Sequence, residues 1–182
     1  MSIRDFTPRS NRRRVQSQRS KIILGVVLAA AILLQIPYPL LDGRVLEIFT
    51  LLTVYSGAAA MLLHARMSFG NKFAFAYLSI TAAFALIVET IGVNTGWPFG
   101  VYEYSKTLGL FIFDVPLVVL FAWTMMAYPA LIAARRIARG WVFLYGGAIL
   151  MGWDLFLDPQ MVTAGRWTWE VTGRSFPFAP EI

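Results

Sequence analysis

The chain has 182 residues, of which 58% are hydrophobic and 14% charged, and it carries a net charge of +6. A soluble domain carries roughly a quarter charged residues, so this composition excludes an ordinary soluble domain and favours a protein that folds in lipid. The chain contains no cysteine, which excludes disulfides, thiolate catalysis and cysteine-ligated metals.

The first 21 residues are strongly basic. They hold seven of the sixteen basic residues, namely Arg4, Arg9, Arg12, Arg13, Arg14, Arg19 and Lys21. Such a tail could contact nucleic acid, but its aromatic content is limited to Phe6, whereas basic residues beside a membrane span commonly fix its orientation. We therefore interpret residues 1–21 as a basic cytoplasmic tail at the lipid surface, and we expect no nucleic-acid partner.

Five apolar stretches follow, each long enough or nearly long enough to cross a bilayer as a helix of about 20 residues. They cover residues 22–41, 45–63, 73–93, 113–134 and 141–157. Pro37 and Pro39 are expected to end or kink the first helix. The predicted fold class is therefore all-α, a polytopic bundle of about five transmembrane helices that occupies residues 22–182.

The distribution of basic residues between the connecting segments predicts the orientation. If the N-terminal tail is cytoplasmic, twelve basic residues lie on the cytoplasmic side, and only Arg44, Lys106, Arg166 and Arg174 lie on the other. Cytoplasmic segments of membrane proteins are enriched in lysine and arginine. The sequence thus predicts a multi-pass protein of the cell membrane with a cytoplasmic N-terminus and with Trp167 on the opposite side.

Two non-cytoplasmic segments, residues 89–106 and 153–170, are rich in glycine, proline and aromatic residues, so we expect structured turns there. Their aromatic side chains have two interpretations of similar weight, which are an interfacial belt and the lining of a binding site. The candidate lining residues are Asn94, Trp97, Tyr102, Tyr104, Trp153 and Trp167.

Carboxylates gather at the same predicted level. Glu89 lies about one turn from the outer end of the third span, and Asp154 lies within the fifth, where an acidic residue is costly and suggests function. Asp158 is four residues after Asp154 and shares its helix face. Glu103 and Asp114 lie nearby in the topology. Asp114 is alternatively a helix cap, and Asp158, which precedes a proline, alternatively shapes a turn.

Metal and nucleotide chemistry have little support in the sequence. His64 is the only histidine, and it lies at the predicted cytoplasmic end of the second span. The chain has no phosphate-binding glycine loop, no dinucleotide fingerprint and no zinc-protease motif. The pair Asp154 and Asp158 alone is weak support for a divalent cation. We therefore expect no metal and no cofactor.

Three stretches of this sequence resemble the membrane-embedded carotenoid biosynthesis family, which includes carotenoid 1,2-hydratases. They are ETIGVNTGWPFGVYEYS at residues 89–105, DVPLVVLFAW at residues 114–123 and WDLFLDPQMVTAGRWTWE at residues 153–170. The resemblance covers roughly residues 45–170. Members of the family continue into further hydrophobic spans after the third stretch, whereas this sequence ends at Ile182.

The resemblance implies a carotenoid substrate dissolved in the bilayer and the addition of water to the terminal 1,2 double bond of an acyclic (ψ) end group, without a redox cofactor. It also implies membrane lipids as partners, together with other enzymes of the carotenoid pathway.

The residues suit this chemistry independently of the resemblance. Hydration of an unactivated alkene begins with protonation, which needs a buried carboxylic acid and leaves a tertiary carbocation. Aromatic faces stabilise such a cation, and a second carboxylate can orient and deprotonate water. We predict Asp154 or Glu89 as the acid. Three groups could then orient water beside the aromatic residues named above. They are whichever of these two residues is not the acid, Asp158, and Glu103.

Other functions remain open from the sequence. A lycopene-cyclase-like enzyme would share the protonation step but capture the cation with an internal double bond. A non-catalytic carotenoid-binding membrane subunit would hold pigment without changing it. A transporter is a weaker alternative, because neither an inverted repeat nor a pair of broken helices is visible.

Overall fold

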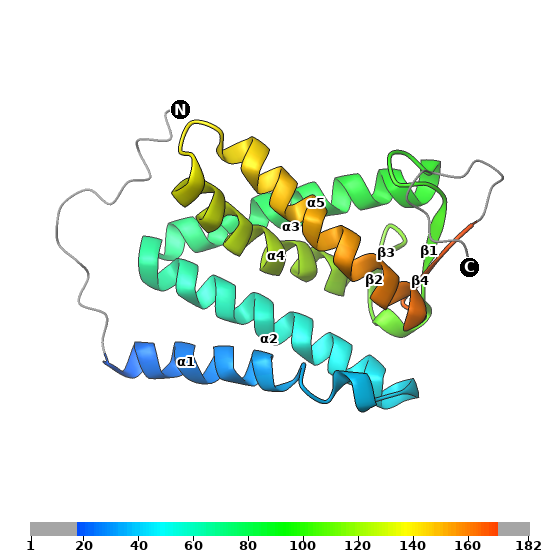
Figure 1. Cartoon of the computed structure of the whole chain (residues 1–182), viewed down its shortest axis with the longest axis horizontal. Coiled ribbons are helices and arrows are strands. Elements are labelled where there is room, and N and C mark those ends of the chain that lie inside the picture. Colours follow the sequence, from blue (N-terminus) through cyan, green and yellow to red (C-terminus); the bar gives the residue numbers. More distant parts are fainter. Residues whose placement is uncertain (1–17, 171–182) are drawn as a thin grey trace. The chain divides into compact units, whose positions relative to one another are not determined.

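The computed structural model describes residues 18–170, so most of the predicted basic tail lies outside the described residues (Figure 1). Five long helices dominate it, and its strands form two short two-stranded ribbons. The predicted all-α fold is thereby confirmed. The chain divides between Thr81 and Ala82 into two compact units, and each is described by itself.

The first unit consists of α1 (Gln18–Leu33), the short 3-10 helix η2 (Tyr38–Leu40), α2 (Gly43–Phe69) and the beginning of α3 (Asn71–Thr95). The helix α1 ends well before residue 41, and the segment that contains Pro37 turns the chain into α2. A hydrogen bond of 2.8 Å between the hydroxyls of Tyr38 and Thr50 ties η2 to α2. The predicted effect of the prolines on the first span is thus confirmed.

The second unit contains the last turns of α3, the strand β1 (Tyr102–Tyr104) and the 3-10 helix η3 (Lys106–Leu108). The hairpin of β2 (Phe111–Ile112) and β3 (Val115–Pro116) leads into α4, and β4 follows α5. The bounds of these last elements are Leu117–Ile137 for α4, Val142–Thr163 for α5 and Trp167–Trp169 for β4. Ala85 of α3 packs with Val115 and Leu120 in the core of this unit.

The pairing of β1 with β4 determines which helix ends meet. The two strands are antiparallel, with Tyr102 opposite Trp169 and Tyr104 opposite Trp167. Because β1 follows α3 and β4 follows α5, the C-terminal ends of both helices lie at one end of the unit, where α4 begins. The structure therefore brings together the two aromatic segments that the sequence placed at one level.

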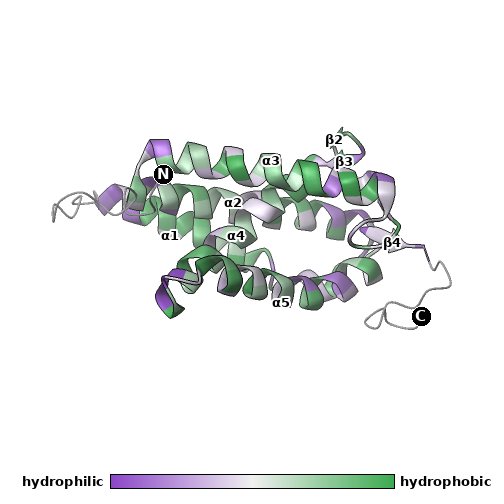
Figure 2. Cartoon of the chain, turned by 90° about the horizontal axis from the view of Figure 1, so that it is seen from above, coloured by the Kyte–Doolittle hydropathy of each residue, from purple (hydrophilic) through white to green (hydrophobic). Residues whose placement is uncertain are grey.

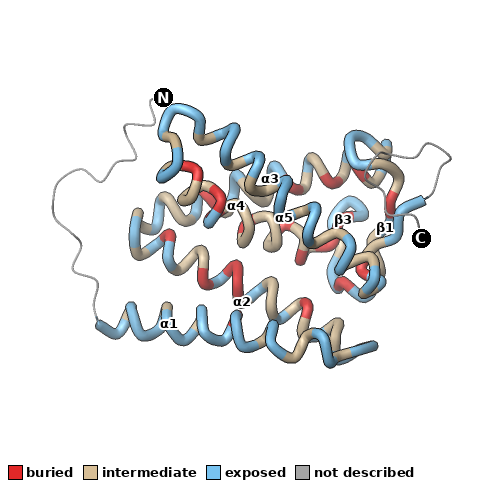
Figure 3. Tube along the Cα trace, in the orientation of Figure 1, coloured by how far each residue is buried: buried red, intermediate tan, exposed pale blue. Residues whose placement is uncertain are grey.

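Four helical segments are long and apolar enough to cross a membrane, namely Gln18–Leu40, Gly43–Phe69, Asn71–Thr95 and Leu117–Ile137. Large apolar side chains project outward from the helices, as at Phe75, which is 74% exposed, and Phe143, which is 76% exposed. Figure 2 shows hydrophobic colouring along the helices, and Figure 3 shows how much of α1 and α5 is exposed. Lipid, rather than water, suits such surfaces. The chain is a polytopic membrane protein.

The predicted fifth crossing corresponds to α5, which has 22 residues but is not one of these four segments, and which carries Asp154 and Asp158. Residues 138–141 connect α4 to α5 at the far end of the unit from the β1–β4 ribbon. The helix α5 therefore returns along the whole length of α4. The number of five membrane crossings stays a prediction, which the path of α5 beside α4 supports.

The predicted start of the fourth span at residue 113 was wrong, because α4 begins at Leu117 with Pro116 as its cap. Asp114 therefore does not cap the helix. It forms, together with Phe113, the tight turn of the β2–β3 hairpin, where both residues have positive φ angles of 63° and 49°. Aspartate and asparagine tolerate this left-handed conformation better than most residues, which explains the acid at this position.

The predicted end of the fifth span at residue 157 was also wrong. The helix α5 continues through Pro159 to Thr163, so Asp158 lies inside the helix and does not shape a turn. Side chains near the proline bond to carbonyls of the helix: Gln160 Nε2 donates to the Phe156 carbonyl at 3.1 Å, and Thr163 Oγ1 to the Pro159 carbonyl at 2.7 Å. Neither bond replaces the one that Pro159, which has no N–H, cannot donate to the Leu155 carbonyl one turn earlier.

Candidate active site

Glu89 is the buried carboxylate of the second unit, and it is 6% exposed. It lies on the buried face of α3, one turn after Ala85 and one turn before Gly92. Three side chains donate hydrogen bonds to it. The hydroxyls of Tyr102 and Tyr104 reach Oε2 at 2.6 and 2.8 Å, and the indole Nε1 of Trp123 reaches Oε1 at 2.8 Å. Helix α3, strand β1 and helix α4 thus converge on one carboxylate.

The alternation of side chains along a strand explains how β1 supplies two donors. Residues two apart in a strand point to the same face, so Tyr102 and Tyr104 both reach Glu89. Glu103, between them, points to the opposite face and is exposed. The structure therefore does not bring Glu103 to the carboxylate, although the sequence placed it among the candidates.

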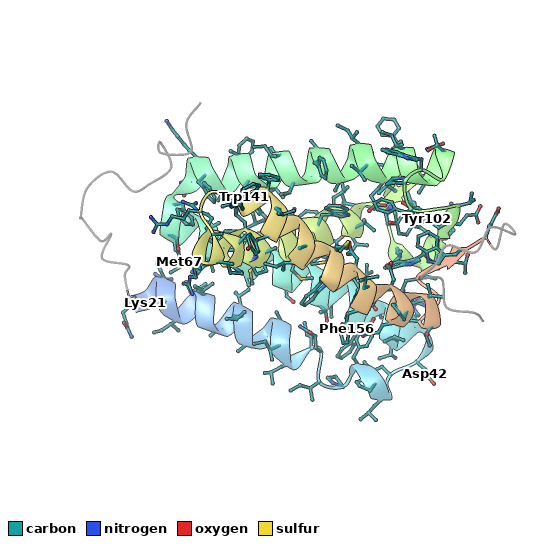
Figure 4. The ribbon with its side chains drawn as sticks, turned by 45° about the horizontal axis from the view of Figure 1, so that its top comes forward. Lys21, Asp42, Met67, Tyr102, Trp141 and Phe156 are labelled. Carbon is teal, nitrogen blue, oxygen red and sulfur yellow. The ribbon has the colours of Figure 1, made fainter. Side chains whose placement is uncertain are left out.

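The strand β4 lays two tryptophans against the two tyrosines. The rings of Tyr102 and Trp169 are 5.0 Å apart, and those of Tyr104 and Trp167 are 5.9 Å apart in an edge-to-face arrangement. We call these four residues the aromatic ribbon. Figure 4 labels Tyr102 near β1, far from Trp141, which lies between α4 and α5. The predicted lining residues Tyr102, Tyr104 and Trp167 are therefore together beside Glu89.

The environment of the two tyrosines keeps their hydroxyls protonated. Burial, and then the charge of the nearby Glu89, raise the pKa of both Tyr102 and Tyr104 well above its ordinary value. A phenol with a raised pKa stays neutral at any physiological pH. Both tyrosines consequently act as permanent hydrogen-bond donors.

Gly92 makes the closest of these contacts possible. A methyl group at this position would lie 2.6 Å from the Tyr102 hydroxyl oxygen and 3.3 Å from its ring, closer than real contacts allow. Any larger residue would therefore push the ring away from Glu89. Sequence reasoning missed Gly92, although its position three residues after a buried acid placed it on the same helix face.

Asp154 and Asp158 lie on the half-buried face of α5, whereas Leu155 and Phe156 between them are exposed. Both carboxyl groups are near enough to Glu89 to interact with it electrostatically, and Asp158 also interacts in this way with Tyr102. In the described part of the chain, no side chain or backbone group donates a hydrogen bond to Asp154. The two acids that the sequence paired thus face the same region as Glu89.

The remaining candidates lie apart from this group. Asn94 is exposed, and its amide donates to the Thr90 carbonyl of its own helix at 2.8 Å. Trp97 is 70% exposed and Trp153 is 50% exposed. None of the three contacts Glu89 in residues 18–170, so an interfacial aromatic belt explains the two tryptophans better than a lining role.

Two tryptophans that contact the site were missing from the sequence-based set. Trp123 lies in the fourth helix within the second of the three motif stretches, and its indole N–H was the signal, because a buried tryptophan needs an acceptor. Trp169 lies two residues after Trp167 and on the same face of β4. Within residues 18–170, no three histidine, aspartate or glutamate side chains are placed to share a metal ion.

The fold and this site define a membrane-embedded helical protein with a cluster of carboxylates, one of them hydrogen-bonded by three side chains, beside an aromatic ribbon. Residues 48–180 match the model of a family described as carotenoid biosynthesis protein. The chain belongs to this carotenoid biosynthesis protein family, which confirms the resemblance carried by the three motif stretches.

The chain is 37% identical over 91 residues to bisanhydrobacterioruberin hydratase of Haloarcula japonica. The alignment covers 46% of this chain and 31% of that protein, so the chain spans about a third of the length of this relative. No solved structure matches the chain.

Proposed function

We propose that this protein adds water to the terminal 1,2 double bond of an acyclic (ψ) end group of a carotenoid dissolved in the bilayer. The observation that carries the proposal is the position of Glu89, a buried carboxylate with three donors, beside Asp154 and Asp158. Family membership and the hydratase among the relatives support carotenoid biosynthesis as the context.

The reaction needs three proton transfers and no redox step. A carboxylic acid donates a proton to C2, the π bond breaks, and a tertiary cation remains at C1. The oxygen of water then bonds to C1 while a carboxylate takes one of its protons, and that proton returns to the acid. Asp154 or Glu89 can be the acid, and the other can receive the proton, because each has a carboxyl group in the same region.

The aromatic ribbon suits the intermediate of this reaction. A cation next to an aromatic face is attracted by its ring electrons, by about 2 kcal/mol or more where water is excluded. Tyr102, Tyr104, Trp167 and Trp169 place four rings around the end of α3 that carries Glu89. A carotenoid end group that reached Glu89 from the lipid would therefore meet both the acid–base groups and the rings that stabilise its cation.

Pigment analysis tests the proposal. Bacteria that accumulate lycopene, γ-carotene or β-carotene would each express the full chain, and their extracts would be compared by mass spectrometry. We expect up to two added waters on lycopene, one on γ-carotene and none on β-carotene, because these pigments have two, one and no acyclic ends. Cyclisation would leave the mass unchanged and change the absorption spectrum. Unmodified lycopene that co-purifies with the protein would favour a binding subunit.

The orientation in the membrane is a further part of the proposal. The lysine and arginine bias favours an orientation with the N-terminus and the α4–α5 connection in the cytoplasm and the aromatic ribbon on the other side. Because the chain lacks cysteine, single-cysteine variants report on this directly. We expect an impermeant maleimide to label Thr168→Cys in intact cells and Gly140→Cys only after lysis, since both positions are exposed. The reverse pattern would contradict the orientation.

A further inference from the structure

The hydrogen bonds around Glu89 leave its side chain with one open acceptor position. A carboxylate offers roughly four acceptor sites, two on each oxygen. Tyr102 and Tyr104 occupy both sites of Oε2, and Trp123 occupies one site of Oε1. The second site of Oε1 therefore remains. The three donors come from two different elements and hold both oxygens in place. The open acceptor site of Oε1 therefore points in one fixed direction.

From this geometry we propose that Glu89 positions the attacking water at the open site of Oε1 and takes its proton, and that Asp154 is the acid. The inference rests on the proposed hydration and assigns the two roles that the reaction leaves open. Trp123 and the two tyrosines are then positioning residues, because they act on water only through Glu89.

The character of the donors supports the role of Glu89. Hydrogen bonds to an ionised acceptor are roughly twice as strong as those between neutral groups, so three donors directed at one side chain suit a carboxylate. A carboxylate accepts a proton and cannot give one. The tyrosines keep their own protons, so they neither supply the alkene with a proton nor compete with water for the base.

Asp154 has the opposite surroundings. In the described chain it receives no hydrogen bond, its side chain is half-buried, and two other carboxyl groups lie within electrostatic range. Negative charges that are close together in a site of low polarity disfavour further ionisation, so a proton on Asp154 relieves the repulsion from Glu89. Asp158 also receives no hydrogen bond in the described chain, but both Asp158 and Glu89 act on Asp154, whereas only Glu89 is recorded as acting on Asp158. Asp154 is therefore the group in this cluster that gains most from holding a proton.

The assigned step is balanced. The Asp154 proton bonds to C2 and the π bond breaks. The water oxygen bonds to C1, and the released proton goes to Glu89 Oε1. A proton transfer from Glu89 back to Asp154 restores both groups, and one water is consumed. If water is not held in place, the cation can lose a proton, for example from C2 to the Asp154 carboxylate, and become an alkene again.

Deuterium separates the two roles. In membranes that contain the full-length protein and a ψ-end carotenoid in D₂O, the wild type should give an alcohol with deuterium at C2. Glu89→Gln should still protonate the alkene but capture little water. We expect its ratio of deuterated alkene to alcohol to rise at least tenfold over the wild-type ratio.

Trp123→Phe is the second variant, because it removes only the N–H donor to Oε1 and keeps a ring that fills most of the same space. We expect the ratio of deuterated alkene to alcohol to rise by a smaller factor than in Glu89→Gln. If Glu89→Gln does not insert, Trp123→Phe tests whether Glu89 positions the water. Trp141→Phe is the matched control, since Trp141 is exposed between α4 and α5, and its ratio should equal that of the wild type.

The outcomes are distinguishable. If the wild type yields neither alcohol nor deuterated alkene, the proposed hydration itself fails. If the wild type makes alcohol but Glu89→Gln loses deuterium incorporation as well, Glu89 is the acid and the inference is overturned. An unchanged ratio in both Glu89→Gln and Trp123→Phe also overturns it, because water is then held elsewhere.

Discussion

Replacing Asp154 with asparagine should abolish hydrated carotenoid while the protein remains inserted and folded. The amide has nearly the same shape as the acid but cannot protonate an alkene, and loss of an acid–base group typically lowers a rate by about 10²–10⁴-fold. Both the alcohol and the deuterated alkene should disappear, because the first proton transfer is common to both products. Pigment extracts of the expressing host measure this directly.

Stability separates a catalytic role from a structural one in this variant. An acidic residue at membrane depth costs about 2.5–3.5 kcal/mol on insertion scales, so an amide should leave the protein as stable as before or more so. Asp114→Asn is the matched control, since asparagine tolerates the positive φ of the hairpin turn and Asp114 is exposed. Wild-type amounts of alcohol from Asp154→Asn would remove the assignment of Asp154 as the acid.

Gly92→Ala should reduce both hydration and thermal stability. The new methyl group would lie 2.6 Å from the Tyr102 hydroxyl, so the ring must move and Glu89 loses a donor. A lost hydrogen bond to a buried charged group costs about 1.5–3 kcal/mol, which should appear as a lower melting temperature in detergent. We expect the yield of alcohol to fall at least tenfold, because Tyr102 holds Oε2 of the proposed base.

Gly147→Ala provides the control for this change, because a methyl group at Gly147 meets no atom within 4 Å. It should be neutral or stabilising by up to about 1 kcal/mol through the higher helix propensity of alanine. Tyr102→Phe in the Gly92→Ala background removes the clashing oxygen and should cost less than the sum of the two single changes. Additive losses would show that the two residues do not compete for the same space.

The large features of this fold follow from hydrophobic runs and the chemistry of a few residues. Spans of about 20 apolar residues predict helices directly, and topology alone put Glu89, Asp154 and Asp158 at one level. Helix ends near prolines were less predictable. The chain stops α1 before Pro37 but continues α5 through Pro159 to Thr163.

The contacts of the site itself were only partly predictable. A strand over residues 102–104 puts Tyr102 and Tyr104 on one face, but no pattern in the sequence distinguished a strand there from a turn. For the same reason, the sequence did not predict that Glu103 points to the opposite face from Tyr102 and Tyr104. The indole N–H of Trp123 indicated that it needs an acceptor, but the acceptor was not predictable, because the contact with Glu89 joins residues 34 apart.

The order of synthesis gives the β1–β4 pairing a consequence for assembly. Glu89 precedes all of its donors in the chain, since Tyr102 follows it by 13 residues and Trp123 by 34. The strand β4, which packs its tryptophans on the tyrosines, is made only after α5. The hydrogen bonds of Glu89 therefore depend on elements that come later in the chain, and the aromatic ribbon is complete only when β4 has paired with β1.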